Sequence, residues 1–341
     1  MALTQGHLHR ISRRRIQEET PVYTAGKKSV ISLAKVSVVE AISILVYGGK
    51  SNSAAISAVS VAGMYNLIAS VVLMVNGKTV FSLNGNQLLF LYQVFTGKRP
   101  LFTDVATTAG AGSFTYQLAA LLPFNDFLAY FSCLDATENP GGIREFKLII
   151  NWTAGNASCF TGGGTITDDS GPNVEVHTER LVGGELDQFN RPQPGSIGYP
   201  YRFRTVVSEQ TNYVGNATKG LKVRLSPKRR YSRLIIQTLN SAGDGVDTIL
   251  NSARVLNDND EVFNITRREI QRVQVDRYNI TAADQAKYFP GLYSLDFASP
   301  GMFPETDWAG SEMFLILDLA ALSNATVHVI SDTFVNSFNE L

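Results

Sequence analysis

The feature that most constrains the fold of this 341-residue chain is a segment pattern that occurs twice in the same order. Residues 76–84 and 258–266 both begin with a polar turn and continue with Val-Phe, a polar residue and an aliphatic residue. A second pair of similar β-type segments follows at 146–151 and 314–318. The spacing between copies shrinks along the chain while the order is kept, as loops of unequal length would produce. The two halves are therefore predicted to be copies of one β-rich unit.

Both copies of the first pattern continue into a helix-start pattern. Asn84 and Gln87 in the first half, and Thr266 and Glu269 in the second, have the spacing of a capping box. In a capping box, the first side chain accepts a hydrogen bond from the first helical turn and the second accepts one from the cap backbone. Apolar residues follow at helical spacing, so we predict a short helix after each of these strands.

The rest of the chain shows mainly strand patterns. Runs rich in β-branched residues are bounded by Gly, Asn, Asp, Pro or Ser, and long helical periodicity is absent. Spaced strands with turn-rich connections are typical of sandwiches and barrels, so the expected fold class is all-β with short helices in loops. The clearest strand segments are 36–47, 67–75, 146–152, 201–207, 234–239 and 313–319.

Composition suggests where the chain divides. Glycine and proline, which interrupt regular structure for different reasons, are concentrated in the middle of the sequence. We therefore expect a Gly/Pro-rich linker over 161–198, one unit over 27–160 and the other over 199–341. Residues 1–26 are expected to form a basic N-terminal arm.

Charge is balanced over the whole chain but not along it. Thirty basic and thirty acidic residues give a formal net charge of zero, so the protein as a whole has no general attraction to nucleic acid. Four arginines nevertheless lie close together near the N-terminus: Arg10, Arg13, Arg14 and Arg15. They are the candidate contacts for an anionic partner, either lipid headgroups or, less favoured, nucleic acid. The alternative is a solvated tail without a partner.

No pattern typical of an active site or cofactor site is present in the sequence. Two of the four histidines lie in the N-terminal segment, which leaves only His177 and His328 for a triad. Neither HExxH nor GxSxG occurs, and the segment 77–79 lacks the earlier glycine of a phosphate-binding loop. We therefore expect no enzymatic activity and no cofactor.

Metal and disulfide patterns are weak as well. The oxygen-rich turn 257–261 lacks the spacing and glycine of a calcium loop, so a solvated turn is favoured over a Ca²⁺ site. Cys133 and Cys159 are too few for a cysteine-rich metal site, and two buried thiols are favoured over a single disulfide.

Membrane and export segments are also not indicated. The uncharged stretch 51–77 is long enough to span a bilayer, but its many serines and asparagines favour a loop followed by a buried strand. The polar, basic N-terminus is not followed by the apolar region of a signal peptide.

Two segments of the second half add a family resemblance. Residues 230–234 (Arg-Tyr-Ser-Arg-Leu) open a strand after a basic turn, and residues 288–297 contain Phe-Pro-Gly-Leu-Tyr. With the duplicated β-rich halves, these segments resemble the double jelly-roll major capsid proteins of tailless, icosahedral, bacteriophage-like DNA viruses with an internal membrane. The resemblance extends over 27–341 as a pattern of elements.

The resemblance implies both an architecture and a function. Each half would be an eight-stranded jelly-roll β-sandwich, and three chains would form a homotrimeric, pseudo-hexameric capsomer that tiles an icosahedral shell. The N-terminal arm would face the internal membrane or the genome. The implied partners are further copies of the chain, vertex or minor capsid proteins and membrane lipid. The implied location is the virion shell, after assembly in the host cytoplasm.

Two other functions remain as alternatives. A secreted carbohydrate-binding or adhesive β-sandwich protein would account for the Asn-x-Ser/Thr sequons, although such sequons also arise by chance in a chain of this composition. The sequons begin at Asn151, Asn156, Asn216, Asn264, Asn279 and Asn324. A two-domain cupin-like enzyme would also be a duplicated β-barrel, but it usually binds metal through clustered histidines that this chain lacks.

Overall fold

The structure is a computed structural model in which the chain divides into two compact units. The first unit comprises Met1–Tyr92, Arg99–Arg204 and Val335–Leu341, and the second comprises Gln93–Lys98 and Thr205–Phe334. Each unit is described by itself below. The residues that the structure describes are 12–36, 38–58, 63–100, 111–124, 134–135, 143–161, 164–182, 203–212, 218–226, 229–258, 260–297, 312–322 and 324–335.

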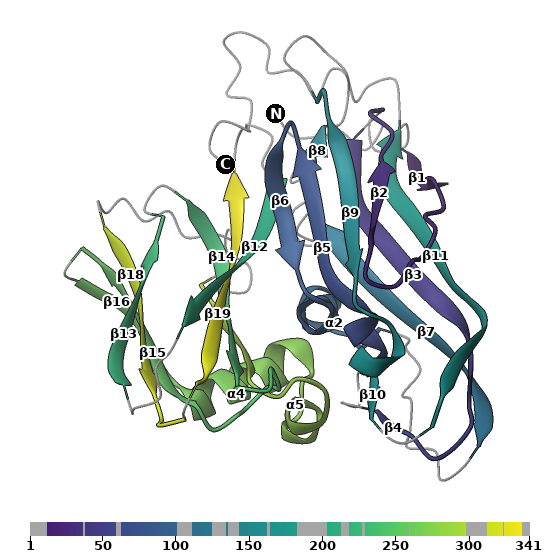
Figure 1. Cartoon of the computed structure of the whole chain (residues 1–341). Coiled ribbons are helices and arrows are strands. Elements are labelled where there is room, and N and C mark those ends of the chain that lie inside the picture. The colour runs from purple at the N-terminus through teal and green to yellow at the C-terminus, as the bar shows by residue number, and fades with distance from the viewer. Residues whose placement is uncertain are drawn as a thin grey trace, which may run out of the picture. The chain divides into compact units, whose positions relative to one another are not determined.

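The first unit is a β-sandwich whose two layers each contain four long strands (Figure 1). One layer has the spatial order β1 (Ser12–Gln17), β11 (Ile166–Val182), β3 (Val38–Asn52) and β7 (Gly112–Pro123). The other has the order β6 (Lys78–Leu83), β5 (Ile68–Val75), β9 (Phe146–Trp152) and β2 (Lys28–Ser32). Shorter elements of this unit are η1 (Gly63–Leu67), α2 (Gly85–Thr96), η2 (Asn156–Ser158), β4 (Ser57–Ala58), β8 (Leu134–Asp135) and β10 (Phe160–Thr161).

The core of this sandwich follows from the alternation of side chains along each strand. In β9, buried and half-buried residues alternate from Phe146 to Trp152. In β3, the buried residues Ile42, Ile44 and Val46 are two positions apart, because successive side chains of a strand point to opposite faces. Apolar surface from the two layers is thereby removed from water, which is the main stabilising contribution to such a fold.

The second unit repeats this arrangement. One layer has the order β17 (Leu292–Asp296), β14 (Arg230–Leu239), β19 (Thr326–Val335) and β12 (Phe203–Asn212). The other has the order β13 (Thr218–Leu225), β18 (Met313–Leu319), β15 (Leu250–Asn257) and β16 (Asp260–Thr266). Two helices, α4 (Arg267–Tyr278) and α5 (Ala282–Tyr288), lie together at one end of this unit (Figure 1).

The strand order confirms the predicted fold class and the internal repeat. In both units, the first, eighth, third and sixth long strands form one layer, and the second, seventh, fourth and fifth form the other. This is the strand arrangement of a jelly roll. The repeated sequence segments occupy equivalent places, since 76–84 includes β6 and 258–266 includes β16, and each strand is followed by a helix. The fold is therefore an all-β double jelly roll.

The two predicted capping boxes have different outcomes. In the first unit, the Gln87 amide N–H donates to Asn84 Oδ1 at 2.9 Å, and the Asn84 N–H donates to Gln87 Oε1 at 3.0 Å. Thr266 is indeed the residue before α4, but its side chain makes no capping hydrogen bond, so the second prediction was wrong in its chemistry. Thr266 is still paired with Ser252 in the β15–β16 ladder, and the strand runs directly into the helix.

Part of the region expected to be a linker is a strand instead. Within 161–198, β11 pairs with β3 over most of its length. Its register shifts at Asp168/Ser170 and at Ser170/Asn173, and Gly171 has a φ of 79°. Glycine in this segment therefore marks irregular positions that interrupt the ladder without ending the strand. Residues 183–198 lie outside the described part of the chain.

The expected N-terminal arm is also partly ordered into the sandwich. Residues 12–17 form β1, which pairs antiparallel with β11. The stretch 51–77 contains the predicted buried strand, β5. No helix among the described residues has both the length and the apolar character needed to cross a bilayer.

Candidate functional site

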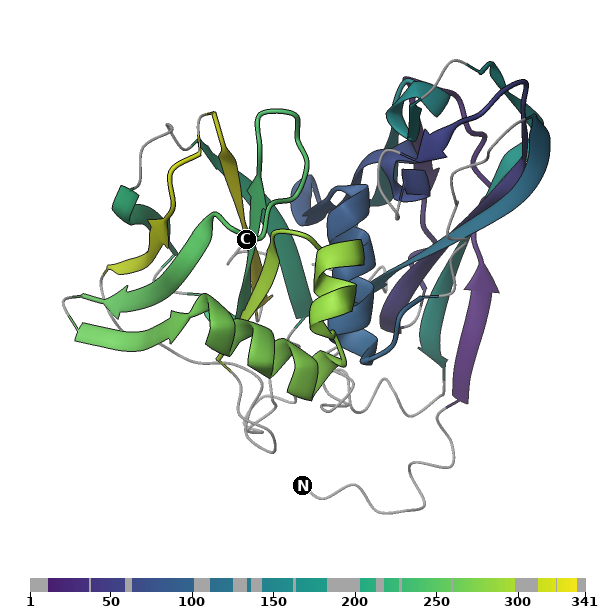
Figure 2. The same cartoon turned by 90° about the horizontal axis from the view of Figure 1, so that it is seen from below.

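The candidate basic site lies on β1, the outermost strand of its layer (Figures 1 and 2). Three of the four predicted arginines, Arg13, Arg14 and Arg15, occupy consecutive positions on this strand, while Arg10 lies outside the described residues. The side chains of Arg14 and Arg15 are exposed, and Arg15 Nη2 is 3.4 Å from Ser43 Oγ. Consecutive strand residues point to opposite faces, so Arg14 and Arg15 present charge on both sides of this edge.

The end of β1 is fastened by a buried ion pair. Arg180 Nη2 lies 2.8 Å from Glu18 Oε1, and the exposed fractions of the two side chains are 0% and 5%. Glu18 also accepts a hydrogen bond from Thr178 Oγ1 at 2.6 Å and one from the Ala34 N–H at 3.1 Å. Arg180 donates to the backbone carbonyls of Ala34 and Val36 as well. Because both charges are well partnered, the chain just after the basic strand is held to the interior of the sandwich.

A second exposed edge lies in the other layer of the same unit, at β2. The burial of β2 alternates, with Val30 exposed by 46% between two buried positions. Val22 and Val36, on either side of β2 in the sequence, are exposed by 81% and 55%. Edge strands with exposed apolar residues tend to pair with other chains unless they are covered. This edge has the properties of an assembly surface.

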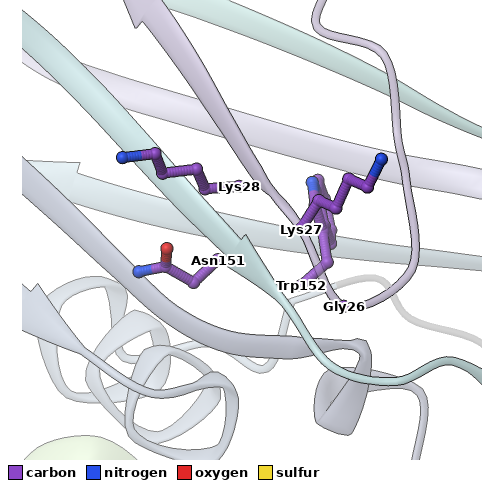
Figure 3. Close-up of a pocket in the computed structure, with 5 residues that line it drawn as sticks. All are labelled: Gly26, Lys27, Lys28, Asn151 and Trp152. Carbon is purple, nitrogen blue, oxygen red and sulfur yellow. The ribbon is translucent and has the colours of Figure 1, made fainter.

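An open hollow adjoins the β2 edge (Figure 3). It is lined by Gly26, Lys27, Lys28, Asn151 and Trp152. Lys28 faces Asn151 across the β2–β9 ladder, and both side chains extend to one side in Figure 3, while Lys27 extends to the other. The buried Trp152 ring is fixed by a hydrogen bond from its Nε1 to Ser29 Oγ at 2.8 Å. The hollow does not enclose a small molecule, so it fits a surface contact better than a ligand site.

The two candidate histidines lie in different units. His177 is on β11 of the first unit and His328 is on β19 of the second. Burial lowers the pKa of His328, which favours its neutral form. In the described ranges, no three His, Cys, Asp or Glu side chains are grouped so that they could hold a metal ion.

The described cysteine is a buried, free thiol. Burial raises the pKa of Cys159 to about 12, which leaves little of the reactive thiolate at neutral pH. Cys133 lies outside the described residues.

Comparison with known proteins identifies the fold. No protein-family model and no curated protein sequence matches the chain. Solved structures do match it, and the major capsid protein of STIV, the Sulfolobus Turreted Icosahedral Virus, superposes with a TM-score of 0.73 at 16% identity over 97% of this chain and 98% of that chain. The chain has the double jelly-roll fold of viral major capsid proteins.

More distant double jelly-roll proteins match over nearly the same length. The major capsid protein P2 of bacteriophage PM2 covers 95% of this chain with a TM-score of 0.54 at 11% identity, and 97% of that chain is covered. The Faustovirus major capsid protein gives a TM-score of 0.59 at 9% identity, and the match covers 95% of this chain and 90% of that chain. Because these superpositions cover nearly the whole of each chain, the similarity extends over both jelly rolls and is not limited to one of them.

Two buried charged residues of the first unit were not predicted from the sequence. Arg180 continues the inward face of β11 after Val174, Val176 and Thr178, and Lys50 does the same on β3. Period-two alternation could have placed both side chains in the interior. Their partners could not have been found in this way, because Glu18 and Asp168 are 162 and 118 residues away in the sequence.

Proposed function

We propose that the chain is a major capsid protein that forms homotrimeric, pseudo-hexameric capsomers of an icosahedral virion shell. The observation that carries the proposal is the duplication of one jelly roll within a chain whose similar structures are major capsid proteins. A trimer of such chains presents six similar sandwiches, which gives a three-fold ring a nearly hexagonal outline. Closed symmetry of this kind lets one chain fill a hexagonal lattice position.

The basic strand supports an inward-facing role for the N-terminus. We propose that Arg10, Arg13, Arg14 and Arg15 contact an internal membrane or, less favoured, the packaged genome. Each basic residue near an anionic membrane contributes about 1 kcal/mol of attraction. The attraction of the four arginines together would therefore be useful but weak enough to be reversible. The anchoring of Glu18 by Arg180 supports this role, because it holds the C-terminal end of the basic strand on the sandwich.

The proposed partners and location follow from the capsid role. The chain would contact its own copies through edges such as β2, and vertex or minor capsid proteins at special positions of the shell. It would be found in the virion after assembly in the host cytoplasm.

The solution mass of the purified chain tests the proposal. Light scattering is expected to give about three times the 37.3 kDa chain mass, and electron microscopy is expected to show hexagonal outlines. A monomer that stays monomeric at high concentration would contradict the trimeric capsomer. It would turn attention to the carbohydrate-binding alternative and a glycan-binding screen.

The carbohydrate-binding alternative has less support. Its main argument was the set of sequons, but the Asn151 side chain is half-buried and donates from Nδ2 to Ser70 Oγ at 2.7 Å. An asparagine held within a β-ladder in this way is a poor position for a bulky glycan.

A further inference from the structure

A lysine lies inside the sandwich of the first unit, where burial of its charged amine is unfavourable. Lys50 continues the inward-facing row of Ile44 and Val46 on β3, and its side chain is fully buried. Lysine usually keeps its ammonium group in water while burying only its stem. A buried charge is costly unless it is closely partnered, so the surroundings of Lys50 Nζ need an explanation.

Two side chains contact the Lys50 amine. Nζ donates to Asn156 Oδ1 at 2.6 Å and forms a short ion pair with Asp168 Oδ1. Asp168 lies opposite Lys50 in the β11–β3 ladder, and Asn156 begins η2, which follows β9 of the other layer. The Asn156 amide is oriented by its own hydrogen bond, from Nδ2 to the carbonyl oxygen of Ile166 at 3.1 Å. The lysine amine, the carboxamide and the carboxylate therefore meet at one point.

This arrangement resembles the start of an acyl transfer. Reacting atoms in near-attack geometries are roughly 3–3.5 Å apart. Nζ lies 2.6 Å from Asn156 Oδ1, which places the amine next to the carbonyl group that it would attack. The Tyr116 ring covers the lysine, with its centroid 5.3 Å from Nζ. Burial raises the pKa values of Tyr116 and Cys159, as expected in a place with little water.

We propose that Lys50 and Asn156 form an intramolecular isopeptide bond, with Asp168 as the proton carrier. Asp168 takes a proton from the Lys50 ammonium, and the amine lone pair forms a bond to Asn156 Cγ while the carbonyl electron pair moves to Oδ1. The C=O bond then re-forms and the Cγ–Nδ2 bond breaks. Asp168 returns its proton to the departing nitrogen, and the second proton lost by Nζ goes with it, so that ammonium leaves. No oxidant or other reactant is required.

The reaction removes the electrostatic cost of the buried lysine. A neutral amide replaces the ammonium group, and the remaining carboxylate of Asp168 stays partly hydrated because its side chain is 35% exposed. The same exposed path lets ammonium escape. Because β3 and β9 belong to opposite layers, the bond would tie the two layers of this jelly roll together across 106 residues of sequence.

The intact mass of the purified full-length chain tests the inference directly. Loss of one ammonia is expected to lower the mass by about 17 Da from the value calculated from the sequence. Tandem mass spectrometry of a digest is expected to give a branched peptide that joins Lys50 to Asn156. A chain with the full calculated mass would overturn the inference. So would a mass loss without the branched peptide, since succinimide formation at an Asn-Gly pair such as 84–85 also releases ammonia.

Two variants separate the role of Asp168 from a general effect on folding. Asp168→Asn is expected to restore the full mass, because its amide cannot carry the proton. Asp169→Asn changes the neighbouring exposed residue and is expected to keep the bond. A branched peptide in the Asp168→Asn chain, or its loss from the Asp169→Asn chain, would refute the assignment of Asp168. This test does not depend on the oligomeric state of the protein.

Discussion

The carboxylate of Glu18 and the guanidinium of Arg180 form a buried ion pair at 2.8 Å that connects the end of β1 to β11. Four other groups complete it, namely the hydroxyl of Thr178, the N–H and C=O of Ala34 and the carbonyl of Val36. Apart from the hydrogen bond from Arg180 to Thr178 within β11, the interactions of the pair join segments that are distant in the sequence. The pair therefore specifies where the N-terminal strand joins the sandwich.

Removing one partner of this pair is expected to destabilise the protein strongly. Glu18→Ala leaves the guanidinium of Arg180 buried without its counter-ion, and breaking buried pairs in this way costs about 3–5 kcal/mol. Urea denaturation followed by tryptophan fluorescence measures the effect. Glu19→Ala changes the adjacent exposed glutamate and is expected to cost less than about 0.5 kcal/mol. Equal losses for the two variants would contradict the role given to the pair.

Neutralising the basic strand is expected to weaken binding to anionic lipid without affecting the fold. The double variant Arg14→Gln/Arg15→Gln loses two exposed charges, or about 2 kcal/mol, which corresponds to an affinity roughly 30-fold lower. Co-sedimentation with phosphatidylserine vesicles at low salt measures it. A matched control, Lys222→Gln/Arg224→Gln, removes two exposed charges from β13 of the second unit. Similar losses for both double variants would indicate nonspecific attraction.

A methyl group at Gly85 is expected to disrupt the start of α2. The Cβ of an alanine there would lie 1.9 Å from the carbonyl oxygen of Tyr65, which is backbone and cannot rotate away. Overpacking of this kind costs about 1–3 kcal/mol and sometimes more. Gly112→Ala serves as the control, because its Cβ would meet its first neighbour only at 4.0 Å. Thermal unfolding compares the two, and an unchanged Tm for Gly85→Ala would show that η1 can move aside.

His328 is expected to make the protein less stable in mild acid. Its pKa is lowered in the folded state by burial, so below the unfolded-state value of about 6.5 the unfolded chain binds more protons than the folded one. Stability is therefore retained above that pH and is lost as the pH falls toward the folded-state pKa. Comparing denaturation of the wild type and His328→Gln from pH 7.5 to 5 measures the effect. An identical pH dependence for both would contradict it.

The sequence predicted the features that depend on neighbouring residues. Val-Phe segments, polar turns and the Asn84–Gln87 capping box are local patterns, and they identified two equivalent pieces of the two jelly rolls. Glycine and proline near 171 wrongly indicated a linker. A long strand can contain such residues at bulges, because β11 pairs with β3 on both sides of the irregular positions. Thr266 had the right position for a cap, but ladder pairing continued to that residue.

The buried charges could not be predicted because they depend on tertiary contacts. Alternation along β3 and β11 gives the direction of Lys50 and Arg180, but a charged residue at an inward position is normally taken as evidence against burial. Only the folded chain places Asp168 next to Lys50 and Glu18 next to Arg180. The arginines of β1 were recognised as a group from the sequence, while their position on a paired strand was not.

The pairing of β1 with β11 also affects how the protein is made on the ribosome. Ser12 pairs with Val182. The first jelly roll therefore cannot complete the layer of β1, β11, β3 and β7 until residue 182 has left the exit tunnel. Until then β11 is missing between β1 and β3, and two strand edges stay open while translation continues. Such nonlocal pairing slows folding and exposes nascent chains to association. The proposed capsid role requires many copies of the chain, and in that role nascent chains would be the stage at which chaperones are needed most.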